Sequence, residues 1–371
     1  MSIERHYFPG NNTPMGFFSY YKHIIGQREA NRIICIKGGP GTGKSTLMKK
    51  IALNFTEKDE DIDFLHCSAD ENSLDGIIIK NKKIALIDAT SPHIMDPVTP
   101  GAVDKIVNLG DYWNEDGISQ NKEEIIDLNE ETSRWYRIAY NYLNAAKSVF
   151  RSIEEIYNNA AESSEIYRLV SNVISKVYNE REISLRPGRM KKFFASAITA
   201  NGVIHYIPSL LEQMKTVYMI SSPVGYSNNS FMEIIAEGAI YRGLNVEAFY
   251  CPMFPDEKIE HIIIPELKTA FITLNEYHDV EPWEISDLWE QDRDIILLDM
   301  NDYMDGLIID KNSQLVSSLK EEYDILLNRA FMNLKKAKET HLLVENMYVP
   351  NMNFREVTEL IETITKEVEA L

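Results

Sequence analysis

The sequence predicts an α/β protein made of two tandem copies of one domain, each a parallel sheet flanked by helices with an added helical segment. Three observations support this prediction: an internal repeat that spans the chain, short apolar runs that alternate with helical patterns, and a glycine-rich loop between the first such run and a helix. A length of 371 residues also fits two domains of ordinary size.

The internal repeat begins at residues 33–52, which align without gaps on 217–236. The offset between the copies then drifts from 184 to 191 residues along the chain. Identical pairs include Ile36/Ile220, Gly41/Gly225, Met48/Met232, Cys67/Cys251, His93/His278 and Leu143/Leu334. Because the matches keep their order to the C-terminus, we interpret 1–185 and 186–371 as two copies of one domain.

The elements of each copy follow from its hydrophobic periodicity. Continuous apolar runs are typical of strands buried on both faces, and apolar residues three or four apart are typical of helices. In the first copy we expect a strand at 33–37, a helix at 44–55, strands at 63–67 and 83–88, and long helices at 131–157 and 164–178. In the second copy the long helices are expected at 315–348 and 354–371. They could form a bundle beside the sheet.

The composition excludes several classes of protein. The chain has 38 basic and 57 acidic residues, a formal net charge of -19, which argues against nucleic acid or an anionic membrane surface as a partner. No apolar run approaches the roughly 20 residues of a membrane span, and no signal-peptide core begins the sequence. The cysteines Cys35, Cys67 and Cys251 form no CxxC pair, so we expect reduced, buried thiols and a cytoplasmic location.

One motif carries chemistry. Residues Gly38, Gly39, Pro40, Gly41, Thr42, Gly43, Lys44 and Ser45 form a complete GxxxxGK[ST] phosphate loop, followed by Thr46. In such a loop successive backbone N–H groups face phosphate oxygens at the start of a helix. We expect Lys44 to pair with the β- and γ-phosphates and the Ser45 hydroxyl to ligate Mg²⁺. The first copy is thus predicted to be a P-loop NTPase domain with ATP and Mg²⁺ as cofactors, since no guanine-reading [NT]KxD motif occurs.

The acidic partner of this loop is predicted to be Asp88. It ends the apolar run 84–88, and such an acid helps to hold Mg²⁺, so we assign Lys44 and Asp88 to catalysis and Ser45 and Asp88 to the metal. The next residue is Ala89, where many ring ATPases have a glutamate that activates water, so the general base is not identified. Asp70, Glu71, Asp75 and His93 are candidates, with a solvated loop as the alternative for the acids.

The second copy lacks these groups. At the positions of Lys44, Ser45 and Asp88 it has Asn228, Asn229 and Thr273. We therefore expect a degenerate repeat that keeps the fold and has lost tight Mg-nucleotide binding. The alternative is a site adapted to another anion. For His93 and His278 a structural role and a γ-phosphate sensor both stay open.

Two further groups of residues have open roles. Arg186, Arg189, Lys191 and Lys192 form a basic cluster at the joint between the copies. It is either a solvated linker or an anion contact made across an intramolecular pseudo-dimer, in the manner of an arginine finger. Trp113, Trp135, Trp283 and Trp289 are expected to serve packing rather than base stacking.

The loop resembles those of AAA-type ATPases and helicases, and the whole chain resembles a family of tandem phosphate-loop ATPases found mainly in spore-forming Firmicutes. This resemblance rests on HYFPGNNTPMGFFSYY at 6–21, the loop at 38–45, IDATSPHIMDP at 87–97, KFFASAITANG at 192–202 and IIIPEL at 262–267. It covers the chain nearly end to end and implies nucleotide binding, without a substrate. The second loop departs from the family pattern of two working sites.

Three functions are compatible with these features. The first is a Mg-dependent ATPase with one active site. The second is a phosphotransferase that acts on a small molecule, and the third is a non-hydrolysing, nucleotide-gated regulatory scaffold. The sequence identifies neither an acceptor nor a protein partner.

Overall fold

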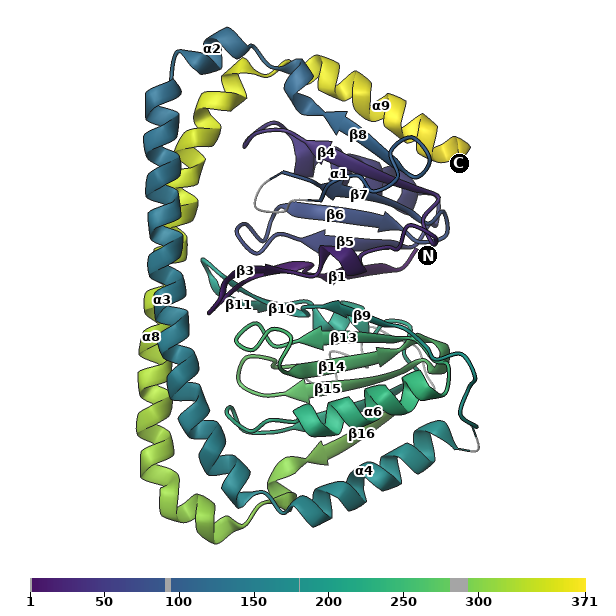
Figure 1. The fold of residues 1–371 in the computed structure, drawn as a ribbon, viewed down its shortest axis with the longest axis vertical. Helices are drawn as coiled ribbons and strands as arrows, with labels where there is room; N and C mark the ends of the chain where they lie inside the picture. The colour runs from purple at the N-terminus through teal and green to yellow at the C-terminus, as the bar shows by residue number, and fades with distance from the viewer. Residues whose placement is uncertain (1, 91–94, 180, 281–292) are drawn as a thin grey trace.

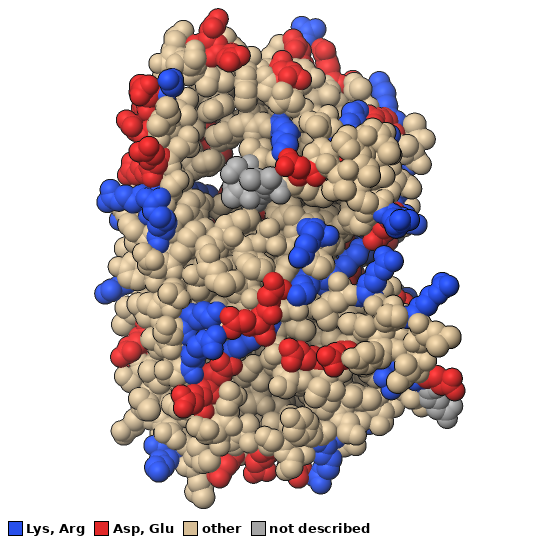
Figure 2. Space-filling model, viewed as in Figure 1, with Lys and Arg blue, Asp and Glu red and all other residues tan. Residues whose placement is uncertain are grey.

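The computed structural model of the protein describes residues 2–90, 95–179, 181–280 and 293–371. Within these ranges the chain is an α/β protein with two six-stranded sheets, one above the other in Figure 1, and two long helices that run side by side along both. Its helices there are too short or too polar to cross a bilayer. On the face shown in Figure 2, acidic and basic side chains are interspersed.

The first sheet is mixed rather than purely parallel. Its strands lie in the order β1 (Glu4–Tyr7), β5 (Ile62–His66), β6 (Leu74–Ile79), β7 (Ile84–Asp88), β4 (Arg32–Lys37) and β8 (Asp104–Asn108). Strand β6 is antiparallel to both of its neighbours, which corrects the prediction of a parallel sheet. The physical reason is that β6 is joined to β5 and β7 by short turns, and only a longer crossover can return the chain to a parallel strand.

The second sheet repeats this arrangement strand for strand. Its order is β9 (Met190–Phe193), β13 (Val246–Tyr250), β14 (Ile259–Ile264), β15 (Thr269–Leu274), β12 (Thr216–Ser221) and β16 (Asp294–Asp299). Strand β14 is the antiparallel one. A helix follows the strand next to the β8 or β16 edge of each sheet, α1 (Lys44–Thr56) after β4 and α6 (Asn229–Tyr241) after β12. The matching order supports a duplication of one α/β unit.

Small elements complete each copy. In the first copy they are β2 (Gly10–Thr13), β3 (Gly16–Ser19), η1 (Tyr21–His23), η2 (Leu109–Tyr112) and α2 (Glu115–Ser119). In the second they are β10 (Ser196–Thr199), β11 (Gly202–His205), α5 (Ile207–Leu210), η3 (Pro265–Leu267), η4 (Met300–Tyr303) and η5 (Val349–Asn351).

The two copies exchange their C-terminal helices. The long helices α3 (Lys122–Ala160) and α8 (Gly306–Tyr348) pack against each other along the sheets (Figure 1). Each leads into a shorter amphipathic helix, α4 (Ser163–Tyr178) or α9 (Phe354–Ala370). Helix α4 of the first copy packs on α6, and α9 of the second copy packs on α1. A division at residue 185 therefore separates the two repeats in the sequence. In the folded structure, however, the last helix of each repeat packs on the sheet domain of the other repeat.

The sheets also share a core where their β1 and β9 edges adjoin. Phe8 and Phe194 exchange backbone hydrogen bonds of 2.9 and 3.0 Å, and buried apolar side chains of both copies form one continuous cluster. The buried Arg5 guanidinium pairs with Glu247 of the other copy and lies 3.9 Å from Asp63. Burial alone would raise the pKa of Glu247, but the nearby charges of Arg5 and Lys80, together with the hydrogen bond from Arg5, outweigh it and lower that pKa. The two copies therefore form one folded unit.

Candidate functional site

The glycine-rich loop lies between β4 and α1 at the carboxyl edge of the first sheet. Gly41 and Gly43 adopt φ values of 67° and 93°, a left-handed conformation that glycine adopts without strain. Helix α1 begins at Lys44. Strand β7 lies beside β4 with Asp88 opposite Ile36, so the end of β7 adjoins the loop. The loop, the start of a helix and a buried acid are thus brought together at one edge.

Lys44 contacts both the loop and Asp88, whereas the Ser45 hydroxyl bonds to the start of β6. Lys44 Nζ donates to the carbonyl oxygens of Gly38 and Gly39, both at 2.9 Å, and lies 3.6 Å from Asp88 Oδ2. The Ser45 hydroxyl accepts a 3.0 Å hydrogen bond from the backbone N–H of Leu74. Three of the predicted chemical groups, an ammonium, a hydroxyl and a carboxylate, therefore surround the loop.

Other residues hold this arrangement in place. The Thr42 hydroxyl donates to the Gly39 carbonyl at 2.8 Å, which closes the loop on itself. Thr90, two residues beyond β7, donates its backbone N–H to Asp88 Oδ1 at 2.9 Å and its hydroxyl to the Gly38 carbonyl at 3.0 Å. Thr90 was not predicted from the sequence. Thr46, by contrast, is exposed on α1.

The candidate bases are engaged in other contacts. Asp70 and Glu71 both pair with Lys338 of α8, at 2.8 and 3.5 Å. Burial alone would raise the pKa of Asp70, but hydrogen bonds from Lys338 and Ser73 outweigh it and lower that pKa, so Asp70 is a weak base. Asp75 is buried and hydrogen-bonded to Tyr21 and Cys67. His93 lies outside the described residues.

Residues of the second copy cover the loop, which the sequence did not predict. A Cβ atom on Gly39 would lie 2.7 Å from Tyr348 Cε1, and one on Gly41 would lie 3.2 Å from the Glu345 carbonyl oxygen. Glycine at both positions is therefore required by the close approach of α8 and η5. The charge of Lys44 also reaches this helix: burial first, and Lys44 second, lower the pKa of His341.

The same cover exists on the loop of the second copy. A Cβ atom on Gly225 would lie 2.3 Å from Ile153 and 3.3 Å from Tyr157 on α3 of the first copy. Tyr157 matches Tyr348 in the repeat, so each long helix ends on the glycine-rich loop of the other copy. The chemistry differs, since the residue that matches His341 is Phe150.

The second loop keeps the backbone plan without the charged groups. Thr273 lies opposite Ile220 in the sheet, in the place that Asp88 has opposite Ile36. The Asn228 amide donates to Ser222 Oγ at 3.0 Å and lies 3.4 Å from Thr273 Oγ1. The cation and the acid of the first loop are thus replaced by a neutral hydrogen-bonded set.

The basic cluster at the joint does not reach the first loop. Lys191 pairs with Glu29 at 3.1 Å, Lys192 pairs with Asp256 at 2.6 Å, and the backbone N–H of Arg189 donates to Asn245. These residues lie at the start of β9, whereas the loop lies at the carboxyl edge of its sheet, so the idea of a contact from this cluster to the first loop is wrong. The trace leading to β9 runs on the side away from α3 and α8 (Figure 1).

Two of the tryptophans lie among the described residues and contact other side chains. Trp113 meets the ring of Tyr348 edge-on, with ring centres 5.8 Å apart, beside the loop cover. Trp135 lies under the Lys336 ammonium, 4.4 Å from the ring centre. Trp283 and Trp289 lie outside the described residues.

Comparisons with known proteins add no assignment. No protein-family model, curated protein or solved structure matches the chain.

Proposed function

We propose that the protein binds Mg-ATP at the loop formed by residues 38–46 and hydrolyses it at one active site per chain. The observation that carries this proposal is the convergence of Lys44, Ser45 and Asp88 on a glycine-rich loop at the start of a helix. The second copy has the same backbone plan and none of the three groups, which makes it an internal comparison.

The expected roles follow from charge and geometry. The backbone N–H groups of the loop and the start of α1 favour the phosphate oxygens. The Lys44 ammonium, now held by two carbonyl oxygens, would exchange these contacts for the β- and γ-phosphates. Ser45 and Asp88 would hold Mg²⁺, directly or through water, which neutralises the charge that develops on the transferring phosphoryl group.

The cover formed by α8 and η5 favours nucleotide-gated regulation as a second candidate function. Tyr348 lies close against Gly39, so any ligand that shifts the loop also shifts the end of a long helix. Phosphate release from ATP alone supports the ATPase, and release only with an added acceptor supports a phosphotransferase. Binding without turnover supports the gated scaffold.

We expect one nucleotide to bind per chain. The second loop lacks the cation and both metal-binding groups, so its affinity for Mg-nucleotide should be negligible beside that of the first. Titration calorimetry of the full chain with a non-hydrolysable ATP analogue and Mg²⁺ measures the stoichiometry. A value near two, or an unchanged isotherm in the variant Gly41→Val, would contradict the assignment.

We expect His341 to position the nucleotide from the second copy. His341 lies on the helix that covers the loop, and burial together with the Lys44 charge lowers its pKa. The matching residue beside the loop of the second copy is Phe150. The variant His341→Phe should lower kcat more than about tenfold with little change in KM, as expected where an interaction is specific to the transition state. Steady-state ATPase assays test this.

The control for His341→Phe is Leu342→Ala, since Leu342 is exposed on the same turn of α8. The control variant should keep full turnover, and His341→Gln, which keeps a hydrogen-bonding side chain, should recover part of it. Full activity of His341→Phe would leave α8 with a purely structural role.

A further inference from the structure

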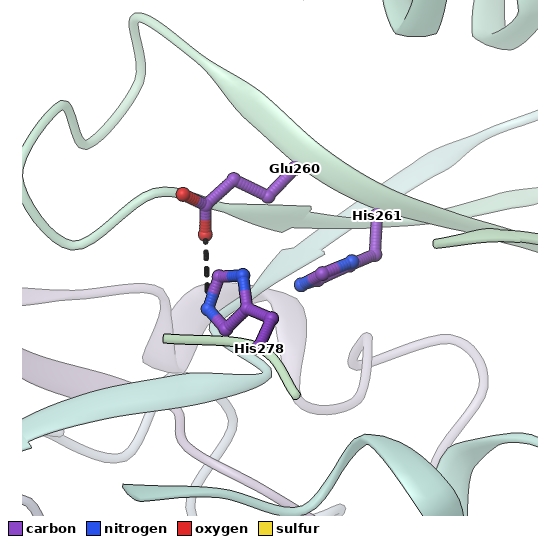
Figure 3. A group of neighbouring side chains, drawn as sticks. All are labelled: Glu260, His261 and His278. Atoms are coloured by element: carbon purple, nitrogen blue, oxygen red, sulfur yellow. Dashed lines mark ion pairs between the residues drawn. The ribbon is translucent and has the colours of Figure 1, made fainter. Parts of the chain in front are cut away.

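A second group of side chains with ligand chemistry lies in the second copy. Glu260 and His261 are neighbours on β14, and His278 follows β15 (Figure 3). Strand β14 has a β-bulge at Glu260, because Phe249 pairs with His261 and Tyr250 with Ile259. Such a bulge re-aims a side chain. It explains how two successive residues of one strand face the same cluster.

The three side chains lie at metal-binding spacing, and one ring nitrogen of each histidine is unpaired. One ligating atom from each lies within 4.8 Å of the others, and His278 Nε2 is 3.7 Å from Glu260 Oε2. His278 Nε2 also contacts Ser196 Oγ at 3.0 Å, whereas its Nδ1 has no hydrogen-bond partner. His261 Nε2 likewise has none, and the two rings point toward one another in Figure 3. Both histidines are at most 2% exposed.

The cluster belongs to the second copy alone. The residue that matches His261 in the first copy is Gly76, where a Cβ atom would lie 2.9 Å from Leu65 Cδ1 and 3.0 Å from the Leu86 carbonyl oxygen. The first copy therefore has no room for this imidazole. Burying a polar group without a partner is unfavourable, and a bound ion would satisfy the unpaired nitrogen of this histidine.

We propose that Glu260, His261 and His278 bind a divalent transition-metal ion of the zinc type. Two imidazoles and one carboxylate are a three-ligand set that such ions accept, leaving an open coordination position. Glu260 and His278 also line a cavity of about 80 Å³ beside the degenerate loop. The open position would face this cavity, whose wall includes Tyr226, Tyr277 and Tyr323. This proposal does not depend on nucleotide binding at the first loop.

Metal binding requires one proton to move. The backbone N–H of Thr273 donates to His261 Nδ1 at 3.2 Å, which places the imidazole proton on Nε2 in the metal-free protein. When Nε2 ligates the ion, that proton moves to Nδ1 and the contact with Thr273 is lost. The His278 ring needs no such change, because its Nε2–H can donate to Ser196 while Nδ1 ligates. A shift of the Thr273 amide signal should therefore accompany loading.

The test is Zn²⁺ binding to the untagged full chain after treatment with a chelator. Calorimetry and elemental analysis should give about one zinc per chain. Removal of one ligand should weaken binding by more than the 10- to 100-fold that outer-shell changes cause. The variants are His261→Gly, which introduces the residue of the first copy, and Glu260→Gln, which keeps the shape of the side chain. His341→Phe, outside the cluster, is the control histidine variant and should bind zinc normally.

Two readouts keep the result decisive. Bound Co²⁺ should show visible d–d absorption in the wild-type chain and lose it in Glu260→Gln, even if His261→Gly does not fold. Lys44→Ala should keep zinc binding, so a failure of the nucleotide proposal is distinguishable from a failure of this one. Absence of stoichiometric zinc, or equal affinity in wild type and Glu260→Gln, would overturn the metal site.

Discussion

Replacing Lys44 with alanine should lower Mg-ATP turnover by about 10²–10³-fold, the loss typical of removing one preorganised group that stabilises transition-state charge. Lys44 is the only ammonium that the described residues place on the loop carbonyls and beside Asp88. Without Lys44, only the backbone N–H groups and the metal ion would stabilise the negative charge that develops on the phosphoryl group. Steady-state phosphate release by the purified full chain measures the loss.

The matched control for Lys44→Ala is Asn228→Ala, because Asn228 occupies the same position in the second copy. It should leave turnover within about twofold of wild type, as expected for a site that makes no contact with the reacting groups. Equal losses in the two variants would show that the active copy was wrongly assigned. Asp88→Asn should lower kcat more than nucleotide affinity, since it disturbs the metal ion rather than the phosphate contacts.

Replacing Arg5 with methionine should destabilise the fold by about 3–5 kcal/mol, the usual result of removing one partner of a buried ion pair. The Arg5 guanidinium joins Glu247 of the second copy to Asp63 of the first, and all three groups are shielded from water. The variant leaves two carboxylates near each other without this cation, although Lys80 still reaches Asp63 at 3.7 Å. Chemical denaturation monitored by circular dichroism measures the free energy of unfolding.

The pH dependence of the Arg5→Met effect has a definite sign. Because the folded-state pKa of Glu247 is lowered from 4.5, its ion pair stabilises the protein above that pH, and the contribution is lost as the pH falls through the folded-state value. The gap in stability between wild type and variant should therefore shrink in acid. The control is Arg355→Ala, whose exposed pair with Glu359 should be worth at most about 1 kcal/mol. A gap that widened in acid would contradict the role of Arg5.

Local patterns predicted the elements because each depends on residues close in sequence. The strand at 33–37 and the helix that begins at 44 lie within one residue of where periodicity places them, whereas α3 and α8 each begin nine residues before the predicted starts at 131 and 315. Lys44 and Ser45 come together with the loop because they are contiguous with it. Asp88 lies beside them because β7 pairs with β4. The apolar run 84–88 predicted a strand that ends at Asp88, but it did not show which strand pairs with it.

The direction of β6 and the exchange of α4 and α9 were not predictable in this way. An apolar run such as Ile77–Ile79 has the same sequence pattern in a parallel and in an antiparallel strand. The direction of β6 is set instead by the short turns that join it to its neighbours. The sequence of an amphipathic helix identifies its apolar face, but it does not identify the sheet or helix against which that face packs. The neighbours of α9 and α4 are therefore known only from the packed structure.

The α/β class, the duplication, the complete loop of the first copy and the loss of its charged groups in the second can all be recognised from the amino-acid sequence. These follow from residue identity and spacing along the chain. Three features emerge only when the chain is folded: α8 of the second copy covers the first loop, the basic cluster lies away from that loop, and Glu260, His261 and His278 meet at a bulge. The physical reason is that such contacts join segments far apart in sequence, whose approach is set by the packing of apolar faces and not by any local pattern.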